Sequence, residues 1–197
     1  MKPGKAITGI RMAVREDAAD IAALLYESFI EHKSQYTEKA FAATTPGQEE
    51  IEDRIDKKIV WVAVCDNINT GTVSIWPRKE ILHIRSMAVR PSARGKGIAT
   101  ALMTHIHELA LEQDYAFLTL NTTAFLSEAI RLYERFGFER FGFDDLHGIT
   151  LIKMIKSLEP ITKNKIEKND YAKRDDYRYP GQENRPFKNS PGEFRQT

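Results

Sequence analysis

The segment at residues 94–100 reads RGKGIAT and has the residue types of an anion-binding turn. Gly95 and Gly97 flank Lys96 at the point where an apolar, strand-like run changes to a helical pattern. Glycine gives the backbone freedom and lets a ligand approach the main chain closely. The first turn of a helix leaves N–H groups without partners, and with the helix dipole they favour an anion. Arg94 and Lys96 add positive charge, so the turn predicts a bound phosphate or diphosphate.

Two common phosphate motifs do not fit this turn. A Walker loop needs Ser or Thr directly after its lysine, and here Gly97 follows Lys96. A dinucleotide fingerprint needs a third glycine where Thr100 stands. The pattern that does fit is Arg/Gln-x-x-Gly-x-Gly/Ala, which is met by Arg94, Gly97 and Ala99.

In this pattern and its setting the chain resembles the GNAT superfamily of N-acetyltransferases. The turn follows IRSMAVRPSA, and LNTTAFLSEAIRLYERFGFE, which begins at residue 120, is similar to the second cofactor motif of the family. The resemblance covers roughly residues 7–156. It implies an α/β (α+β) fold with a mixed, mostly antiparallel central sheet of six to seven strands and about four helices. It also implies acetyl-coenzyme A as co-substrate and a sheet that splays between its fourth and fifth strands.

The resemblance assigns roles to particular residues. The diphosphate of the cofactor would sit on the turn made by Arg94, Gly95, Lys96, Gly97, Ile98, Ala99 and Thr100. Its pantetheine arm would pair, as a substitute strand, with the backbone exposed after a bulge at Met87, Ala88 and Val89. Asn121 would hold the cofactor or an ordered water. Tyr133 would protonate the coenzyme A sulfur, although it also falls in an apolar stripe and a core role stays open.

The general base is less clearly indicated. His83 aligns with a position where several acetyltransferases carry glutamate, and an imidazole titrates near neutral pH. By strand parity His83, Arg85 and Met87 share one face, so His83 could face the acceptor amine. A structural or solvent-facing His83 is an equal alternative.

Two other places could supply the base. His147 lies in the loop between the last two strand patterns, which often borders the acceptor cavity in this family. Glu31 and His32 lie near the end of the first helix, where a surface helix end explains them as well. No base is required if the amine arrives deprotonated.

The elements that would position these residues follow from hydrophobic periodicity. Strands are expected at 10–14, 59–65, 72–76, 81–89, 116–120, 138–143 and 149–155, and helices from 16 to about 29, at 48–58, from 98 to about 110 and at 125–136. The turn DNINTG predicts an antiparallel hairpin, and the strand–helix–strand order after Ile81 predicts a parallel crossover. Gly137 is the expected C-terminal stop of the last helix.

Composition limits the possible partners and the compartment. With 29 basic and 28 acidic side chains, the net charge of +1 gives no general attraction to nucleic acid or membrane. Cys65 is the only cysteine, so no intrachain disulfide can form and a cytoplasmic location is expected. No metal is expected, because His105 and His107 are two apart on a helix and cannot bind one ion together.

The sequence predicts an acetyltransferase domain at 1–158 and a charged, proline-containing tail at 159–197 that is disordered or loosely docked. The aromatic and basic residues of the tail could contact RNA or a partner surface. The predicted activity is direct transfer of an acetyl group to a primary amine of a small molecule or peptide, by a monomer or homodimer. The alternative is a non-catalytic acyl-coenzyme A-binding module that regulates or assembles. The sequence leaves the acceptor and the acyl chain length open.

Overall fold

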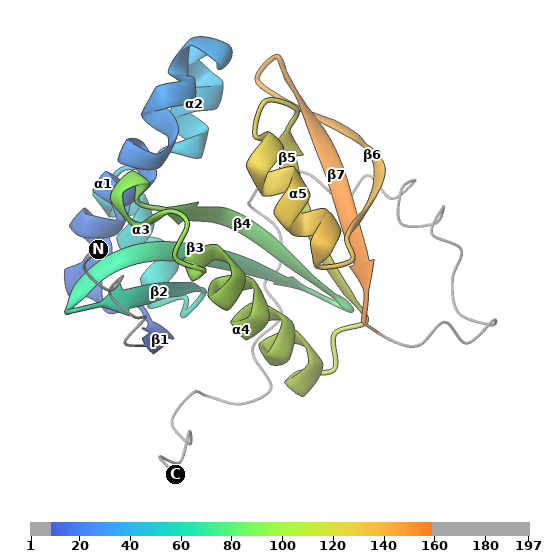
Figure 1. Ribbon diagram of the computed structural model, residues 1–197, viewed down its shortest axis with the longest axis horizontal. Coiled ribbons are helices and arrows are strands. Elements are labelled where there is room, and N and C mark those ends of the chain that lie inside the picture. The colour runs from blue at the N-terminus through green and yellow to red at the C-terminus, as the bar shows by residue number, and fades with distance from the viewer. Residues whose placement is uncertain (1–8, 159–197) are drawn as a thin grey trace.

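The computed structural model describes residues 9–158, which form one seven-stranded sheet with helices on both faces (Figure 1). The strands are β1 (Gly9–Met12), β2 (Val60–Cys65), β3 (Ile68–Arg78), β4 (Ile81–Val89), β5 (Phe117–Thr123), β6 (Glu139–Leu146) and β7 (Ile149–Ser157). The helices are α1 (Ala18–Phe29), α2 (Glu38–Thr44), α3 (Gln48–Asp56), α4 (Ile98–Glu112) and α5 (Ser127–Arg135). Short 3-10 turns lie at η1 (Arg15–Asp17), η2 (Ile30–Gln35) and η3 (Pro91–Ala93).

The sheet has the strand order β1-β2-β3-β4-β5-β7-β6. Only β4 and β5 pair in parallel, and every other neighbouring pair is antiparallel. The expected mixed, mostly antiparallel sheet is confirmed, and so are its hairpin before β4 and its crossover through α4. Figure 1 shows that the sheet divides between β4 and β5, whose far ends point in different directions.

The division between β4 and β5 is visible in the strand register. The two strands pair only from Ile81 opposite Phe117 to Ile84 opposite Leu120. Beyond that point β4 continues along β3, while β5 pairs with β7 up to Thr123. The expected splay between the fourth and fifth strands is therefore present, and it leaves one edge of β4 without a neighbouring strand.

A β-bulge lies on β4 where the splay begins. Arg85 lies opposite Ser74 and Ala88 opposite Thr72, so two residues of β4 face one residue of β3. Ser86, within the bulge, has a φ of 50°. Paired residues point to the same face, so Arg85 and Ala88 share a face. The parity prediction that Met87 lies on the face of His83 and Arg85 is wrong, because the extra residue shifts the alternation.

The helices pack on the sheet through apolar stripes. One face of α4 buries Ile98, Leu102, Met103, Ile106, Leu109 and Ala110. In Figure 1 α4 and α5 lie in front of the sheet. On the other side α1 packs against α3 and against β3 and β4. These two helical layers hold β4 from both faces, but neither fills the gap that opens beside its edge.

Some elements differ from the sequence predictions. Helix α2 was not expected, and with it the described residues contain five α-helices rather than about four. The turn of the β2–β3 hairpin is only Asp66 and Asn67, with φ values of 49° and 63°, so β3 begins earlier than expected. Gly137 has a φ of 84° just after α5, as expected for a helix stop. No helix among residues 9–158 is long and apolar enough to cross a membrane. The predicted tail at 159–197 lies outside the described residues.

Gly71 on β3 faces helix α4 and leaves no room for a larger side chain. A Cβ built on Gly71 would lie 2.7 Å from Ile98 Cγ2 and 3.0 Å from Leu102 Cδ1. We expect Gly71→Ala to lower the free energy of unfolding by about 1–3 kcal/mol, because overpacking forces neighbouring side chains to move. Denaturant unfolding measures this change. Gly9→Ala is the matched control, since a Cβ there meets nothing within 4 Å; equal stabilities of the two variants would contradict the prediction.

Candidate active site

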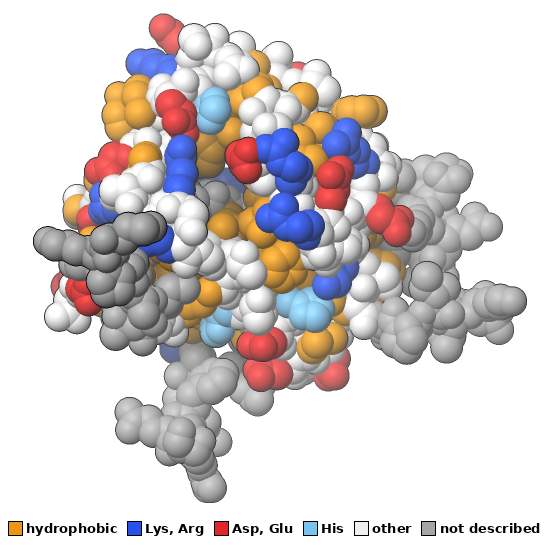
Figure 2. All heavy atoms as spheres, viewed as in Figure 1, with side chains coloured by type: hydrophobic (Ala, Val, Ile, Leu, Met, Phe, Trp, Pro, Cys, Tyr) orange, Lys and Arg blue, Asp and Glu red, His pale blue; other side chains and the backbone are white. Residues whose placement is uncertain are grey.

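A cavity of about 740 Å³ occupies the gap between β4 and β5. Most of its walls come from the end of α1 with η2, the second half of β4, the turn before α4, and the end of β5 with α5. The end of α2 and two leucines of the β6–β7 hairpin complete them. Figure 2 shows the surface hollowed between these elements, with hydrophobic side chains on its sides. A concave, partly apolar site with a few polar groups is typical of a small-molecule pocket.

The glycine turn forms one end of the cavity. Gly95 and Gly97 have φ values of 75° and 78°, which only glycine adopts without strain, and Ile98 begins α4 directly afterwards. A Cβ built on either glycine meets nothing within 4 Å, so both face open space. The N–H groups of the first helical turn lack partners within the helix. The turn thus has the shape and the dipole that suit a phosphate group.

All of the predicted turn residues except Lys96 line the cavity. The Lys96 ammonium lies on the surface and donates to the Ser92 carbonyl at 3.1 Å. Arg94 does line the cavity. Its Nη1 lies 2.5 Å from Glu31 Oε1, and its Nη2 donates to the Ser28 carbonyl at 3.1 Å. The positive charge of the turn is therefore partly balanced by a carboxylate from η2.

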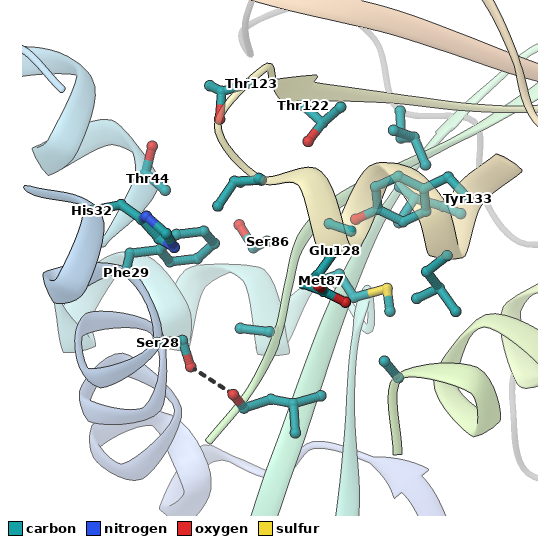
Figure 3. Close-up of a pocket in the computed structure, with 18 of the residues that line it drawn as sticks. Ser28, Phe29, His32, Thr44, Ser86, Met87, Thr122, Thr123, Glu128 and Tyr133 are labelled. Carbon is teal, nitrogen blue, oxygen red and sulfur yellow. Dashed lines mark hydrogen bonds between the residues drawn. The ribbon is translucent and has the colours of Figure 1, made fainter. Parts of the chain in front are cut away.

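Met87, Ala88 and Val89 line the cavity along the edge of β4 that faces away from β3. The hydroxyl of Ser28 donates to the Val89 carbonyl at 3.1 Å, the bond drawn in Figure 3. The same hydroxyl, which has a single proton, also lies 2.7 Å from the Leu24 carbonyl oxygen within α1. The bulge residue Ser86 also lines the cavity, and its Oγ accepts from Arg54 Nη1 of α3 at 2.9 Å.

Tyr133 of α5 lies against the cavity from the side opposite α1. Its side chain is 8% exposed, and its ring packs edge-on against Phe138 with centroids 6.0 Å apart. In Figure 3 the phenol oxygen points into the cavity, toward Met87 and Glu128. Burial raises the pKa of Tyr133 to about 12, so the phenol keeps its proton at neutral pH. The ring of Tyr133 is thus part of the core, while its protonated hydroxyl points into the cavity.

His83 lines the cavity from the paired part of β4, where its Nδ1 lies 3.0 Å from Thr119 Oγ1. Burial lowers the pKa of His83 to about 3. Repulsion from nearby cations acts in the same direction, first from Arg85 and then from Arg78 and Lys153. The imidazole is therefore neutral at physiological pH. It can accept a proton, but only as a weak base.

The other candidate bases lie in different places. His147 is exposed in the β6–β7 turn and does not line the cavity. Its carbonyl accepts from Thr37 Oγ1 at 2.9 Å, which ties that turn to the start of α2. Glu31 and His32 do line the cavity, and His32 Nε2 lies 3.6 Å from Glu31 Oε1. Figure 3 shows His32 on the wall beside Phe29 and Thr44.

An aromatic cluster that was not expected from the sequence closes the cavity opposite the glycine turn. Phe125, just after β5, packs edge-on against Tyr36 with ring centroids 4.9 Å apart and lies 5.8 Å from the ring of His32. Ala40 of α2 packs with Leu146 and Leu151 in a second, smaller hydrophobic cluster behind it. We call the segment at residues 30–44 the roof. The sequence did not predict these contacts, because His32 and Tyr36 pack against Phe125, which lies about 90 residues further along the chain.

Asn121 lies at the expected position, where β5 ends at the cavity. Its Nδ2 donates to Asp144 Oδ2 on β6 at 3.3 Å. The next two residues, Thr122 and Thr123, also line the cavity and were not singled out from the sequence. The only sequence signal for them is a run of three polar residues at the end of an apolar strand. Within residues 9–158 no group of three or more His, Cys, Asp or Glu side chains could hold a metal ion.

Comparisons with known proteins agree with this geometry. Residues 56–140 match the family model of the acetyltransferase (GNAT) domain. An N-acetylaspartate synthetase of Danio rerio is 39% identical over 99 residues, which are 49% of this chain and 34% of the relative. YjgM of Escherichia coli (strain K12), an uncharacterized N-acetyltransferase, is 37% identical over 87 residues, which are 42% of this chain and 52% of YjgM. The chain thus spans about a third of the first of these relatives and half of the second.

Solved structures share the fold at low sequence identity. The PaiA N-acetyltransferase of Thermoplasma acidophilum, solved in complex with coenzyme A, superposes with a TM-score of 0.66 at 16% identity, covering 76% of this chain and 98% of that one. A GCN5-related N-acetyltransferase of Rhodopseudomonas palustris has a TM-score of 0.66 at 21% identity, covering 78% and 98%. Residues 56–140 thus match the GNAT acetyltransferase domain, and the described residues share the fold of these N-acetyltransferases, with its strands splayed above a glycine turn.

Proposed function

We propose that this chain transfers an acetyl group from acetyl-coenzyme A to a primary amine by direct attack in a ternary complex. One observation carries the proposal: a glycine turn suited to a phosphate and an unpaired strand edge open into the same cavity. A diphosphate-containing ligand with an amide-bearing arm matches both features at once. Few other ligands combine these two groups.

The residues of the cavity fit acetyl-coenzyme A. The diphosphate would lie on the open side of Gly95 and Gly97 with Arg94 beside it, and the arm would pair with backbone groups of Met87, Ala88 and Val89. Acetyl-coenzyme A supplies an acetyl group activated as a thioester. The solved structure of the Thermoplasma acidophilum PaiA protein holds coenzyme A in the same fold.

Tyr133 is the proposed acid. As the amine nitrogen bonds to the acetyl carbon and the carbon–sulfur bond breaks, the sulfur needs a proton, and the phenol holds one at neutral pH because burial raises its pKa. His83 is the proposed base in its neutral form. Its lowered pKa makes it a weak base, so an amine that arrives deprotonated would need little help from it.

The acceptor is proposed from the relatives. Those with 37–39% identity in Danio rerio, Xenopus tropicalis and Homo sapiens are named N-acetylaspartate synthetases. L-Aspartate is therefore the first acceptor to test, followed by other amino acids, polyamines and peptides. We also propose that the protein works in the reducing cytoplasm, since Cys65 is buried and has no cysteine to pair with.

A thiol-release assay with acetyl-coenzyme A and this panel of amines tests the activity. Release that depends on an amine, together with the acetylated amine in a mass spectrum, supports the proposal. Tight binding of coenzyme A without turnover on any amine would instead favour a non-catalytic binding module.

Gly97→Glu tests the phosphate turn. The new side chain would enter the open space in front of the turn, strain a left-handed backbone and add a negative charge. We expect acetyl-coenzyme A to bind at least about 30-fold more weakly in calorimetry, on the scale of one lost charge-assisted hydrogen bond. Gly47→Glu is the control: Gly47 also precedes a helix, but its φ is −74° and it does not line the cavity. Equal affinity of both variants would refute the role of the turn.

Tyr133→Phe tests the acid. The ring and its packing on Phe138 are kept while the proton is lost. We expect kcat to fall about 10- to 1000-fold, the range of a general acid, with the Kd for acetyl-coenzyme A changed by less than about 2-fold. Stopped-flow turnover and calorimetry measure the two. Wild-type turnover would leave Tyr133 a core residue only.

His83→Gln tests the charge of the buried imidazole. Below pH 6.5 the unfolded chain binds a proton on this histidine, whereas the folded chain binds it only near pH 3. The unfolded state then holds more protons, so the stabilising contribution is full above about pH 6.5 and is lost as the pH falls toward about 3. We expect the variant to lose less stability than the wild type between about pH 7 and about pH 5. An NMR titration in which the His83 ring changes charge near pH 6.5 would overturn this assignment.

A further inference from the structure

Ser86, the bulge residue of β4, accepts a hydrogen bond from a buried arginine. Arg54 Nη1 of α3 donates to Ser86 Oγ at 2.9 Å, and Arg54 is only 2% exposed. The other end of the guanidinium, Nη2, lies 2.5 Å from Oε1 of Glu50, one turn earlier on the same helix. A series of contacts therefore runs from the surface carboxylate of Glu50 through Arg54 to Ser86, which lines the cavity (Figure 3).

The direction of this hydrogen bond determines what the serine hydroxyl can still do. A guanidinium has only donors, so Ser86 Oγ is the acceptor and its own proton points elsewhere. Among residues 9–158 the bond from Arg54 is the only hydrogen bond of the Ser86 side chain. A hydroxyl that accepts from a cation is polarised by it and becomes a stronger donor. Ser86 can therefore offer a polarised O–H group to a ligand in the cavity.

The backbone of Ser86 adopts an unusual conformation in order to hold this position. Its φ of 50° lies in the left-handed region, which serine rarely adopts. Thr72, on the β3 side of the same bulge, shows the ordinary arrangement of a buried hydroxyl. Its Oγ1 donates to the Trp61 carbonyl at 3.1 Å, and the residue does not line the cavity. Strain at a residue on a cavity wall is typical of a group that is held for a ligand.

The charges near Ser86 are positive. Arg85, the preceding residue, also lines the cavity. Burial lowers the pKa of His83, and the positive charges of Arg85, Arg78 and Lys153 lower it further. All of the charged groups that act on this histidine are cations, so the surroundings of His83 and Ser86 favour an anionic group.

Ser86 and Tyr133 reach the cavity from different sides of the sheet. Arg54 holds Ser86 from α3, which packs with α1 on one side, whereas α5 carries Tyr133 on the other side (Figure 1). In the proposed reaction the sulfur lies at the phenol of Tyr133, so the nucleophile approaches the acetyl carbon from the Ser86 side. Of the two carboxylates that line the cavity, Glu128 belongs to α5 and Glu31 is paired with Arg94.

We propose that Ser86 donates its polarised hydroxyl to a carboxylate of the acceptor, with Arg54 and Glu50 as positioning residues. This inference rests on the proposed function and adds a chemical class, because the acceptor is then an amine that also carries a carboxylate. Carboxylate oxygens only accept hydrogen bonds, and they carry the charge that the surrounding cations favour. The same cations disfavour an ammonium group, so an amine held beside them loses its proton more easily.

Succinate tests this contact without turnover, because it has two carboxylates and no amine. In ligand-observed NMR titrations, on the free protein and with coenzyme A added, the wild type should bind succinate but not the uncharged succinamide. Ser86→Ala should weaken succinate binding at least about 10-fold, the effect of losing a hydrogen bond to a charged group, with the Kd for coenzyme A changed by less than about 2-fold. Thr72→Val, which removes a buried hydroxyl beside the same bulge, is the control and should bind succinate as the wild type does. Equal affinity of the wild type and Ser86→Ala, or no difference between the two compounds, would refute the contact.

Two further variants separate the hydroxyl and the arginine from a merely structural role. Ser86→Gly lacks the hydroxyl but is free of strain at a positive φ, so it should fold and should bind succinate as weakly as Ser86→Ala. Arg54→Lys keeps a charge behind Ser86, whereas Arg54→Met removes it. We expect succinate to bind more weakly to Arg54→Met than to Arg54→Lys, with coenzyme A binding kept in both. Wild-type affinity in Ser86→Gly would overturn the role of the hydroxyl, and equal affinity of the two arginine variants would overturn that of Arg54.

Turnover distinguishes this contact from the proposed activity. Ser86→Ala should raise the KM for L-aspartate at least about 10-fold and leave unchanged the KM for ethanolamine, which has no carboxylate. An equal fall in kcat with both amines would place the hydroxyl on the acetyl group and overturn the assignment. A wild type that binds succinate through Ser86 but acetylates no amine would keep the contact and remove the activity.

Discussion

The separation of β4 from β5 is the constraint on which the site depends. Strand edges tend to find partners, because unpaired N–H and C=O groups are unfavourable away from water. Two features oppose closure of this gap. The bulge at Ser86 turns β4 away just after its last pair with β5 at Ile84. β5 is bound along its whole length to β7 and cannot bend back without breaking that ladder. The pairing of β4 with β3 and of β5 with β7 therefore keeps the gap between β4 and β5 open.

Arg54 forms a hydrogen bond with the side chain of the bulge residue Ser86. This arginine of α3 is only 2% exposed, yet it donates to Ser86 Oγ and pairs with Glu50. A buried charge and a serine with positive φ are both unfavourable, and they persist only where the surroundings fix them. Ser86 itself lines the cavity. A strained serine thus lies on the cavity wall and a buried arginine contacts it, as expected near a site shaped for a ligand rather than for stability.

The sequence predicted those parts of the site whose conformation depends only on residues that are adjacent in the chain. The conformation of the glycine turn depends on Gly95 and Gly97 themselves, so their types and spacing were enough. Helix α2 and the aromatic contacts of the roof were missed because the roof depends on contacts such as the one from Thr37 to His147, 110 residues away. The parity of β4 failed for a related reason, since nothing local to Ser86 reveals that Arg54 will reach it. His83 was identified as a titratable residue, but its burial, which sets its pKa, comes from the packed fold.

Charge is distributed unevenly along the cavity, and this distribution suits the proposed chemistry. At the glycine turn the charged Arg94 pairs with Glu31. It lies close to the backbone N–H groups of the turn, which can bind an anion. Deeper inside, burial moves two pKa values in opposite directions, that of Tyr133 up and that of His83 down, and both shifts favour the neutral form. An amine that enters the same surroundings is subject to the same desolvation and loses its proton more easily. The fold would thus hold the charged part of the cofactor at the entrance and keep the reacting groups neutral, which is the state that a nucleophilic amine and a proton-donating phenol both need.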